Sequence, residues 1–348
     1  MKKIFFYSVS LTLIFMVSCT GKKSSKNETK LSAEELANYR QAAAMFAVLP
    51  AEAPNPENQL TPEKVALGKA LYYDNRLSKD QTQSCNTCHN LETYGVDNEP
   101  TSEGDNGSLG TRNSPTTLNS AFHSAQFWDG RNKDVEEQAG GPILNPVEMA
   151  IPDEEFVVNR LKGVEEYQRM FAAAYPEEED PVTYKNLTWA IGAFERTLIT
   201  PSKFDKYLAG DDNALTKEEL KGMKTYVDVG CATCHSGALL GGTLFMKFGL
   251  TVNYWDYTHS AVIDSGKYVE TRNPADMFVF KSMPLRNIEK THPYFHDGSV
   301  AGLEDAVQIM AQTELNKELT EGQVNEITVF LKTLTGEVPE SALLTQAP

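Results

Sequence analysis

Apolar residues recur at intervals of three and four along much of the chain, which predicts a mainly α-helical protein. The clearest stretch is 184–198, whose apolar face consists of Leu187, Ile191, Phe194 and Leu198. The same spacing predicts further helices, over 32–46, 61–71, 164–175, 216–229, 303–310 and 321–334. Long loops with at most short strands are predicted where polar and glycine-rich sequence intervenes, at 94–115, 237–249 and 256–276.

Local signals predict where several of these helices begin and end. Ser32 with Glu35, and Thr216 with Glu219, have the spacing of capping boxes, in which two side chains satisfy backbone N–H groups of the first turn. Gly230 follows the helix that begins after Thr216, and a glycine at this place typically ends a helix. This helix therefore ends directly before a cysteine.

The pattern Cys-x-x-Cys-His occurs twice, as Cys85-Asn-Thr-Cys88-His89 and as Cys231-Ala-Thr-Cys234-His235. In this spacing both thiols can add to the vinyl groups of a haem while the adjacent imidazole binds the iron. A thioredoxin-type redox pair also uses Cys-x-x-Cys, but it does not need the histidine. We therefore predict two covalently bound c-type haems, with His89 and His235 as iron ligands.

The N-terminus has the pattern of an export signal. Two lysines precede an apolar run over 4–17, which is too short to span a membrane comfortably and is typical of a secretory signal. A small residue and then Cys19 follow, as in bacterial lipoprotein cleavage sites. This predicts that 1–18 are removed and that Cys19 carries a lipid, with 19–58 forming a lipid-anchored tether and N-terminal helix. Ordinary signal cleavage that discards Cys19 is the alternative, and in both cases the protein is periplasmic.

Length and charge limit the function classes. The chain has 348 residues, which predicts two haem domains, 59–200 and 201–348. A formal net charge of −16 argues against nucleic acid as a partner and suits a small basic protein. Of the five cysteines, four belong to the haem motifs and Cys19 is the fifth, so no disulfide is expected.

The two halves carry matching signatures in the same order, which predicts an internal duplication. After each haem motif come an Arg-Asn pair and then an aromatic-x-Asp-Gly run, namely Arg112-Asn113 with Phe127-Trp128-Asp129-Gly130, and Arg286-Asn287 with Phe295-His296-Asp297-Gly298. Beyond these runs the first half reaches Glu148 and the second reaches Met310. If the halves share a fold, these two side chains face the open sides of their haems.

The two positions suit different chemistry. A haem with histidine and methionine ligands has a raised potential and no free coordination site, which suits electron transfer. A haem with an open side can bind peroxide, provided that an acid–base group moves a proton between the two oxygens. Glu148 can do this, and Gln138 can donate a further hydrogen bond. A non-enzymatic di-haem electron carrier is the alternative, in which Glu148 has no role.

Residues from about 61 to 336 resemble the bacterial di-haem cytochrome c peroxidase family. The matching runs include Ser84-Cys-Asn-Thr-Cys-His-Asn-Leu91, Arg112-Asn-Ser-Pro115, Ala125-Gln-Phe-Trp-Asp-Gly-Arg131, Pro146-Val-Glu-Met149, Ala193-Phe-Glu-Arg-Thr197, Pro284-Leu-Arg-Asn287 and Pro293-Tyr-Phe-His-Asp-Gly298. The resemblance implies two cytochrome c-like domains whose haems face across their interface. It further implies reduction of hydrogen peroxide to water with electrons from a small periplasmic donor such as a cytochrome c, and a homodimer.

The resemblance also implies residue roles. It makes the haem on His89 peroxidatic and the haem on His235 the one that receives electrons. The other implied residues are the distal pair Glu148 and Gln138, the inter-haem Trp128, the sixth ligand Met310, and a calcium site at Asn113, Thr291 and Pro293. A related enzyme of the methylamine-utilisation type, which oxidises another protein, is a rival, but it is expected to have tyrosine at the position of Met310.

One position departs from the family pattern. Many members carry a histidine sixteen residues after the first haem-motif histidine, and it caps the peroxidatic iron until the second haem is reduced. Asp105 stands at this position. We therefore expect the first haem to be open without reductive activation. His123 could replace the missing ligand, but a single histidine beside Phe122 is more often a buried structural residue.

Overall fold

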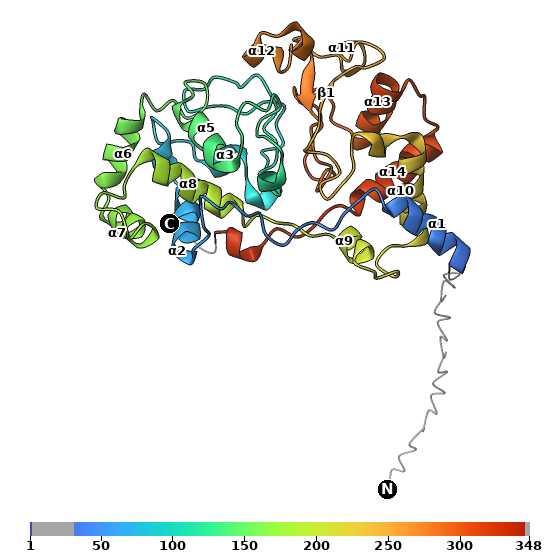
Figure 1. Ribbon diagram of the computed structural model, residues 1–348, viewed down its shortest axis with the longest axis horizontal. Coiled ribbons are helices and arrows are strands. Elements are labelled where there is room, and N and C mark those ends of the chain that lie inside the picture. The colour runs from blue at the N-terminus through green and yellow to red at the C-terminus, as the bar shows by residue number, and fades with distance from the viewer. Residues whose placement is uncertain (2–30, 345–348) are drawn as a thin grey trace.

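The computed structural model describes Met1 and residues 31–344, and in it the chain forms two helical lobes (Figure 1). The predicted signal sequence, Cys19 and most of the tether lie outside the described residues. The prediction of a mainly helical protein is confirmed. No helix within 31–344 is both long and apolar enough to cross a membrane.

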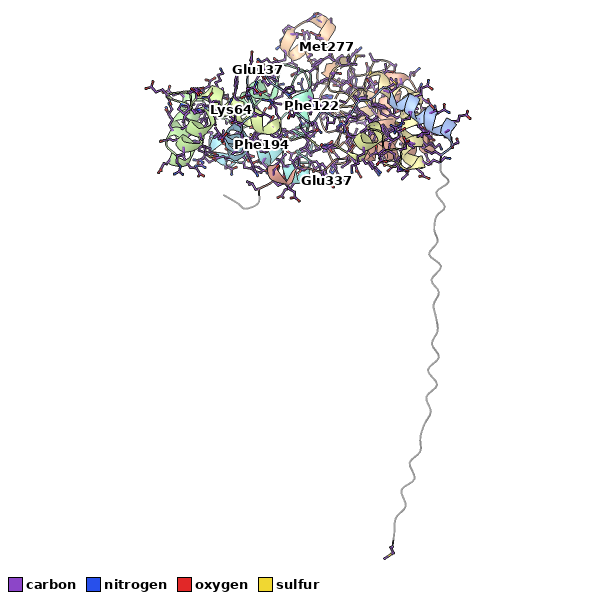
Figure 2. The ribbon with its side chains drawn as sticks, turned by 60° about the horizontal axis from the view of Figure 1, so that its bottom comes forward. Lys64, Phe122, Glu137, Phe194, Met277 and Glu337 are labelled. Atoms are coloured by element: carbon purple, nitrogen blue, oxygen red, sulfur yellow. The ribbon has the colours of Figure 1, made fainter. Side chains whose placement is uncertain are left out.

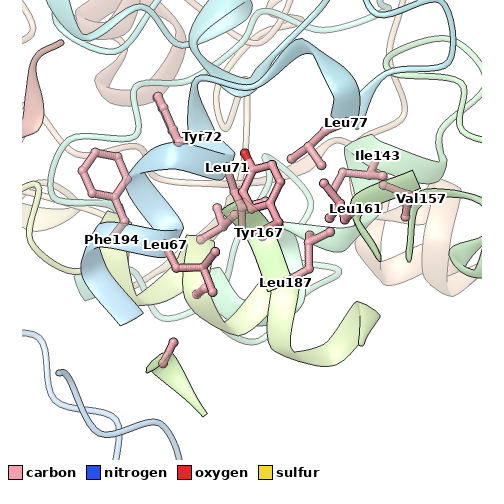
Figure 3. Close-up of a cluster of buried hydrophobic side chains, with 14 of the residues drawn as sticks. Leu67, Leu71, Tyr72, Leu77, Ile143, Val157, Leu161, Tyr167, Leu187 and Phe194 are labelled. Carbon is pink, nitrogen blue, oxygen red and sulfur yellow. The ribbon is translucent and has the colours of Figure 1, made fainter. Parts of the chain in front are cut away.

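The first lobe is built around the crossing of α2 (Pro62–Tyr72) and α8 (Tyr184–Glu195). Figure 3 shows its core, in which Leu67 and Leu71 of α2 and Leu187 of α8 are fully buried. The other elements of this lobe are α3 (Cys85–Cys88), α4 (Val135–Gln138), α5 (Gly140–Leu144), α6 (Glu154–Lys162), α7 (Glu165–Ala174) and the 3₁₀ turns η1 (Asn75–Leu77), η2 (Leu91–Thr93) and η3 (Ser120–Phe122).

The second lobe is built around the crossing of α10 (Lys217–Val229) and α14 (Glu321–Lys332). Strands β1 (Phe245–Lys247) and β2 (Val279–Lys281) pair antiparallel, with Met246 opposite Phe280. The remaining elements are α1 (Ala33–Ala43), α9 (Lys203–Leu208), η4 (Cys231–Thr233), α11 (Trp255–Thr258), α12 (Tyr268–Thr271), η5 (Pro274–Asp276) and α13 (Leu303–Leu315). The segment around α12 and Met277 projects beyond the body of the protein (Figures 1 and 2).

Both ends of the described chain cross between the lobes (Figure 1). Helix α1 packs on α10 of the second lobe, whereas Arg196 of the first lobe donates a hydrogen bond from Nε to the carbonyl of Ala53. At the other end, η6 (Glu340–Ala342) returns to the first lobe, where Tyr73 Oη donates to the carbonyl of Ala342. The lobes are therefore tied together by two straps, and the domain limits 59–200 and 201–348 stay predictions.

Each main helix crossing has a glycine at its closest point. A Cβ atom on Gly68 of α2 would lie 1.8 Å from the carbonyl oxygen of Ala190 in α8. A Cβ atom on Gly222 of α10 would lie 2.1 Å from the carbonyl oxygen of Glu326 in α14. Because both obstructing atoms belong to helix backbone, a side chain at either glycine would push the helices apart.

Gly68→Ala is therefore expected to lower the free energy of unfolding of the first lobe by about 1–3 kcal/mol, the usual cost of overpacking. Gly322→Ala in the first turn of α14 is the matched control, because its nearest neighbouring atom would be 3.9 Å away. Thermal unfolding followed by circular dichroism measures both. An unchanged midpoint for Gly68→Ala would show that the crossing tolerates a methyl group.

The helix signals in the sequence are mostly confirmed. Both predicted capping boxes are present, and Gly230 ends α10 with φ of 111°. Helix α13 continues to Leu315, five residues past its predicted end, because apolar and polar positions keep a helical spacing there. Helices α6 and α9 were not predicted, and the short helices α11 and α12 lie in sequence predicted as a loop.

Candidate haem sites and active site

An apolar cavity of about 220 Å³ lies in the second lobe against Cys231, Cys234 and His235. Nδ1 of His235 lies 3.2 Å from the carbonyl oxygen of Leu240, an arrangement that leaves Nε2 for a metal. Burial lowers the pKa of His235, so the ring stays neutral and able to bind iron. Two thiols, an oriented imidazole and an apolar cavity together fit a covalently bound haem.

Three methionines line this cavity, Met246, Met283 and Met310. The backbone carbonyl of Met283 lies against the ring of His235, and Ser282 Oγ is 3.5 Å from its Nδ1. The segment that carries Met283 is therefore on the histidine side of the cavity. Met310 comes from a different element, α13, and lines the same cavity.

The first haem motif forms the short helix α3, which ends at Cys88 and has His89 as its C-cap. Nδ1 of His89 is buried without a hydrogen-bond partner, and burial lowers the pKa of the ring. Burial also raises the pKa of the Cys88 thiol to about 11. Half-buried thiols beside a neutral imidazole fit a second covalently bound haem.

A buried tyrosine supports the histidine in both motifs. Tyr72 Oη donates a hydrogen bond of 2.6 Å to the carbonyl of His89. Tyr226 Oη donates one of 2.8 Å to the carbonyl of His235. Each tyrosine lies on the first helix of its main crossing, so the same contact fixes the position of each histidine.

Glu148 lies beside the first haem motif. Its charge raises the pKa of the Cys88 thiol, and its Oε1 accepts a hydrogen bond of 2.7 Å from Asn145 Nδ2. Burial raises the pKa of Glu148, although the bond from Asn145 and the charge of Arg131 oppose this effect. A carboxyl group with a raised pKa at this place can take up and release a proton during a reaction.

Gln138 and Glu148 flank the short helix α5. Gln138 is the last residue of α4 and is half-buried, and α5 begins two residues later. Asn145 is the C-cap of α5 and holds the Glu148 carboxylate. The sequence did not indicate this role for Asn145, whose only signal was its place next to the Pro146-Val-Glu-Met149 run.

Trp128 lines the haem cavity of the second lobe. Its Nε1 donates a hydrogen bond of 2.9 Å to the carbonyl of Asn113, and its own carbonyl accepts one of 2.7 Å from the backbone of Lys281. The indole lines the cavity of the second lobe, with its ring 6.3 Å from that of His296 in an edge-on arrangement. Trp128 therefore belongs to the first half of the chain and borders the haem site of the second.

A partly buried ion-pair network joins the halves next to Trp128. Arg112 pairs with Asp129 at 2.5 Å and, through Nε, with Asp264 of the second half at 2.6 Å. Although burial opposes ionisation, Arg112 keeps the pKa of Asp264 below its usual range. The sequence singled out Arg112 as part of a repeated motif but gave no sign of this partner 152 residues away.

His123 is held by a buried lysine. Its Nδ1 lies 3.1 Å from Nζ of Lys281. The same Nζ also donates a hydrogen bond of 2.7 Å to the carbonyl of Ala125. Burial lowers the pKa of Lys281 to about 7, and it places the pKa of His123 well below its usual value. These contacts orient the ring through Nδ1 and leave Nε2 free, so the structural interpretation of His123 stays a prediction.

The predicted calcium residues gather where the halves meet. Asn113 Nδ2 donates a hydrogen bond of 2.9 Å to the carbonyl of Glu99. The backbone N–H of Asn113 donates another to the carbonyl of His296. Asn98 Nδ2 donates hydrogen bonds to the carbonyls of Lys290 and His292, the two residues that flank Thr291. Within 31–344 no three acidic, histidine or cysteine side chains are grouped to hold a metal ion. A cation here would rely on amide and carbonyl oxygens, which suit calcium.

Comparison with known proteins decides the family. The sequence profile described as di-haem cytochrome c peroxidase matches residues 62–213. Cytochrome c551 peroxidase of Pseudomonas aeruginosa is 44% identical over 303 residues, which are 86% of this chain and 87% of that protein. The chain belongs to the di-haem cytochrome c peroxidase family. The predicted family and the oxidoreductase class are thereby confirmed, and the family implies two c-type haems.

Other relatives agree. Cytochrome c551 peroxidase of Nitrosomonas europaea is 45% identical over 302 residues, with 86% of this chain and 87% of that protein covered. Among solved structures, a MauG-like protein associated with microbial copper homeostasis is similar with a TM-score of 0.74 at 30% identity. The match covers 85% of this chain and 95% of that one, so it extends over both lobes.

Proposed function

We propose that the protein reduces hydrogen peroxide to water at the haem on His89, with electrons from a small periplasmic cytochrome c that enter at the haem on His235. The observation that carries the proposal is the half-buried carboxyl group of Glu148 beside Cys88. An electron carrier would have no use for such a group. The reaction consumes two electrons and two protons for each hydrogen peroxide and releases two waters.

A c-type haem supplies an iron that exchanges electrons and, where a coordination site is free, binds peroxide. Glu148 accepts the proton from one peroxide oxygen and returns it to the other oxygen, which leaves as water. Asn145 orients the Glu148 carboxylate for this transfer through its bond to Oε1. Gln138 donates a hydrogen bond to the peroxide and helps to polarise it.

The second site receives the electrons. Met310 completes the ligands of the iron held by His235, and a thioether ligand raises the potential so that the site accepts electrons readily. Trp128 lies on the path from this site to the first one, oriented by Asn113 and by the backbone of Lys281. Methionine in place of tyrosine at 310 argues against the methylamine-utilisation type of reaction.

The experiment that tests the proposal is steady-state oxidation of a reduced cytochrome c by hydrogen peroxide, in which two cytochromes should be oxidised for each peroxide. Turnover should fall as the pH falls through the pKa of Glu148, because only the carboxylate accepts a proton. Burial raises this pKa, so the acid limb should lie above the ordinary glutamate value of about 4.3. Absence of peroxide-dependent oxidation would favour the electron carrier.

Internal duplication is part of the proposal. Gly68 and Gly222 occupy equivalent places in the two main helix crossings. Tyr72 and Tyr226 on the same two helices each hold the backbone carbonyl of a haem-motif histidine. Matching packing and matching hydrogen bonds support a common ancestor for 59–200 and 201–348.

Further parts of the proposal concern the surroundings of the enzyme. Calcium binds at Asn113, Thr291 and Pro293 and steadies the interface, as the amide and carbonyl groups gathered there support. Cys19 carries the lipid that holds the protein to a membrane on its periplasmic side, and two copies form a homodimer. Metal analysis of the purified holoprotein and radiolabelled fatty-acid incorporation in a Cys19→Ser variant test the first two.

A further inference from the structure

Asp105 is bound by the loop that leads into the first haem motif. Its Oδ1 accepts hydrogen bonds from Ser78 Oγ at 2.7 Å, from Thr82 Oγ1 at 2.6 Å and from the Thr82 backbone at 3.2 Å. Its Oδ2 accepts one of 2.6 Å from the backbone of Asp80. Although burial opposes ionisation, these bonds keep the pKa of Asp105 below its usual value. The carboxylate therefore stays charged and fully engaged at neutral pH.

The backbone around Asp105 packs against the segment that carries Glu148. The backbone N–H of Asp105 donates a hydrogen bond of 2.7 Å to the carbonyl of Glu148 itself. At Gly104 a Cβ atom would lie 1.9 Å from the carbonyl oxygen of Val147, so the two backbones touch there. Asn106 Nδ2 donates a hydrogen bond of 3.0 Å to the carbonyl of Pro146.

The segment 145–150 is a turn with its own hydrogen bonds, from the N–H groups of Glu148 and Ala150 to the carbonyl of Asn145, and it also has outside contacts. It follows the end of α5, has no regular structure and exposes Pro146 and Val147. A further contact comes from loop 78–82, where the backbone N–H of Lys79 donates a hydrogen bond of 2.8 Å to the carbonyl of Met149. Lys79 lies between Ser78 and Asp80, the loop residues that bind Asp105. Asp105 thus closes a clamp whose two arms, 78–82 and 104–106, both hydrogen-bond to the backbone of 146–149.

We propose that Asp105 is a positioning residue for Glu148, which it holds at a fixed place beside Cys88 by fastening loop 78–82 to the backbone of 104–106. The inference rests on the proposed role of Glu148 as the proton-transfer group. Geometry of this kind matters for rate, since a displacement of about 1 Å can cost on the order of 10²-fold. Asp105 touches neither peroxide nor haem in this account and acts through Glu148.

Asp105→Asn tests the clamp, because an amide nitrogen cannot accept the bond from Asp80. In the holoprotein it should lower kcat/KM for hydrogen peroxide by about 10- to 100-fold and leave kcat/KM for reduced cytochrome c unchanged. Amide hydrogen exchange at 146–150 should rise, while the absorption spectra of both haems are kept. Ser78→Ala, which removes one of the four bonds to the Asp105 carboxylate, should show a smaller loss with the same pattern.

A double variant separates this inference from the proposed function. If Asp105 acts through Glu148, adding Asp105→Asn to Glu148→Gln should cause no further loss in kcat/KM for peroxide. If Asp105→Asn lowers kcat/KM for peroxide by the same factor in the Glu148→Gln variant as in the unaltered enzyme, the inference is overturned. The peroxidase proposal would still stand. Full activity of Glu148→Gln alone would overturn the role of Glu148 instead. Asp153→Ala, which removes the N-cap of α6 in the same lobe, controls for general destabilisation and should change neither kcat/KM.

Discussion

Glu148→Gln is expected to lower the rate of peroxide reduction by about 10²- to 10⁴-fold, the usual contribution of a positioned acid–base group. Glutamine keeps the size and the hydrogen bonding of the side chain, so Asn145 can still contact it and the fold is preserved. The amide cannot accept a proton from one peroxide oxygen and pass it to the other. Steady-state oxidation of reduced cytochrome c by peroxide, with haem content measured for each variant, gives the result.

Glu155→Gln is the matched control, because Glu155 is an exposed residue in the first turn of α6 in the same lobe. Its turnover should equal that of the unaltered enzyme. Unchanged turnover of Glu148→Gln with both haems incorporated would mean that another group transfers the proton.

Met310→His is expected to lower the potential of the second haem by on the order of 0.2 V, since axial ligands tune haem potentials over a range of about 0.8 V. Imidazole donates more strongly than a thioether and favours the oxidised iron, so electrons from the donor should arrive more slowly. Turnover with reduced cytochrome c should fall, whereas the potential of the haem on His89 should not move. A spectroelectrochemical titration measures both potentials.

Met246→Leu and Met283→Leu are the controls for this variant, because both methionines line the same cavity. Neither should change the potential of the second haem by as much. A large drop for Met283→Leu and none for Met310→His would assign the sixth ligand to Met283.

Local signals in the sequence predicted the ends of helices well. They could not predict contacts between residues that are far apart in the sequence. Capping boxes and glycine ends act within four residues, so they could be found in the chain itself. The same kind of signal could have revealed α6, because Asp153 caps it and Val157 and Leu161 form its buried face. The straps that cross between the lobes could not be predicted, since their contacts join residues more than 100 positions apart.

In the candidate site, too, the residue types could be predicted from the sequence but the contacts between distant residues could not. The covalent haem motifs and Glu148 are visible in the sequence because their residue types and order carry the chemistry. At Asp105 the sequence shows only that a histidine is missing. The partners that use its carboxylate, Ser78 and Thr82, come from a loop 23–27 positions earlier, so the clamp became visible only in the folded chain.

Electron paramagnetic resonance on the fully oxidised holoprotein, beside peroxide turnover without prior reduction, tests the central claim most directly. We expect a high-spin signal from one haem together with immediate turnover, because Asp105 stands where many family members carry the inhibitory histidine and its carboxylate is bound by loop 78–82. Two low-spin haems, with no turnover in either the oxidised or the half-reduced state, would contradict the account and identify the protein as an electron carrier.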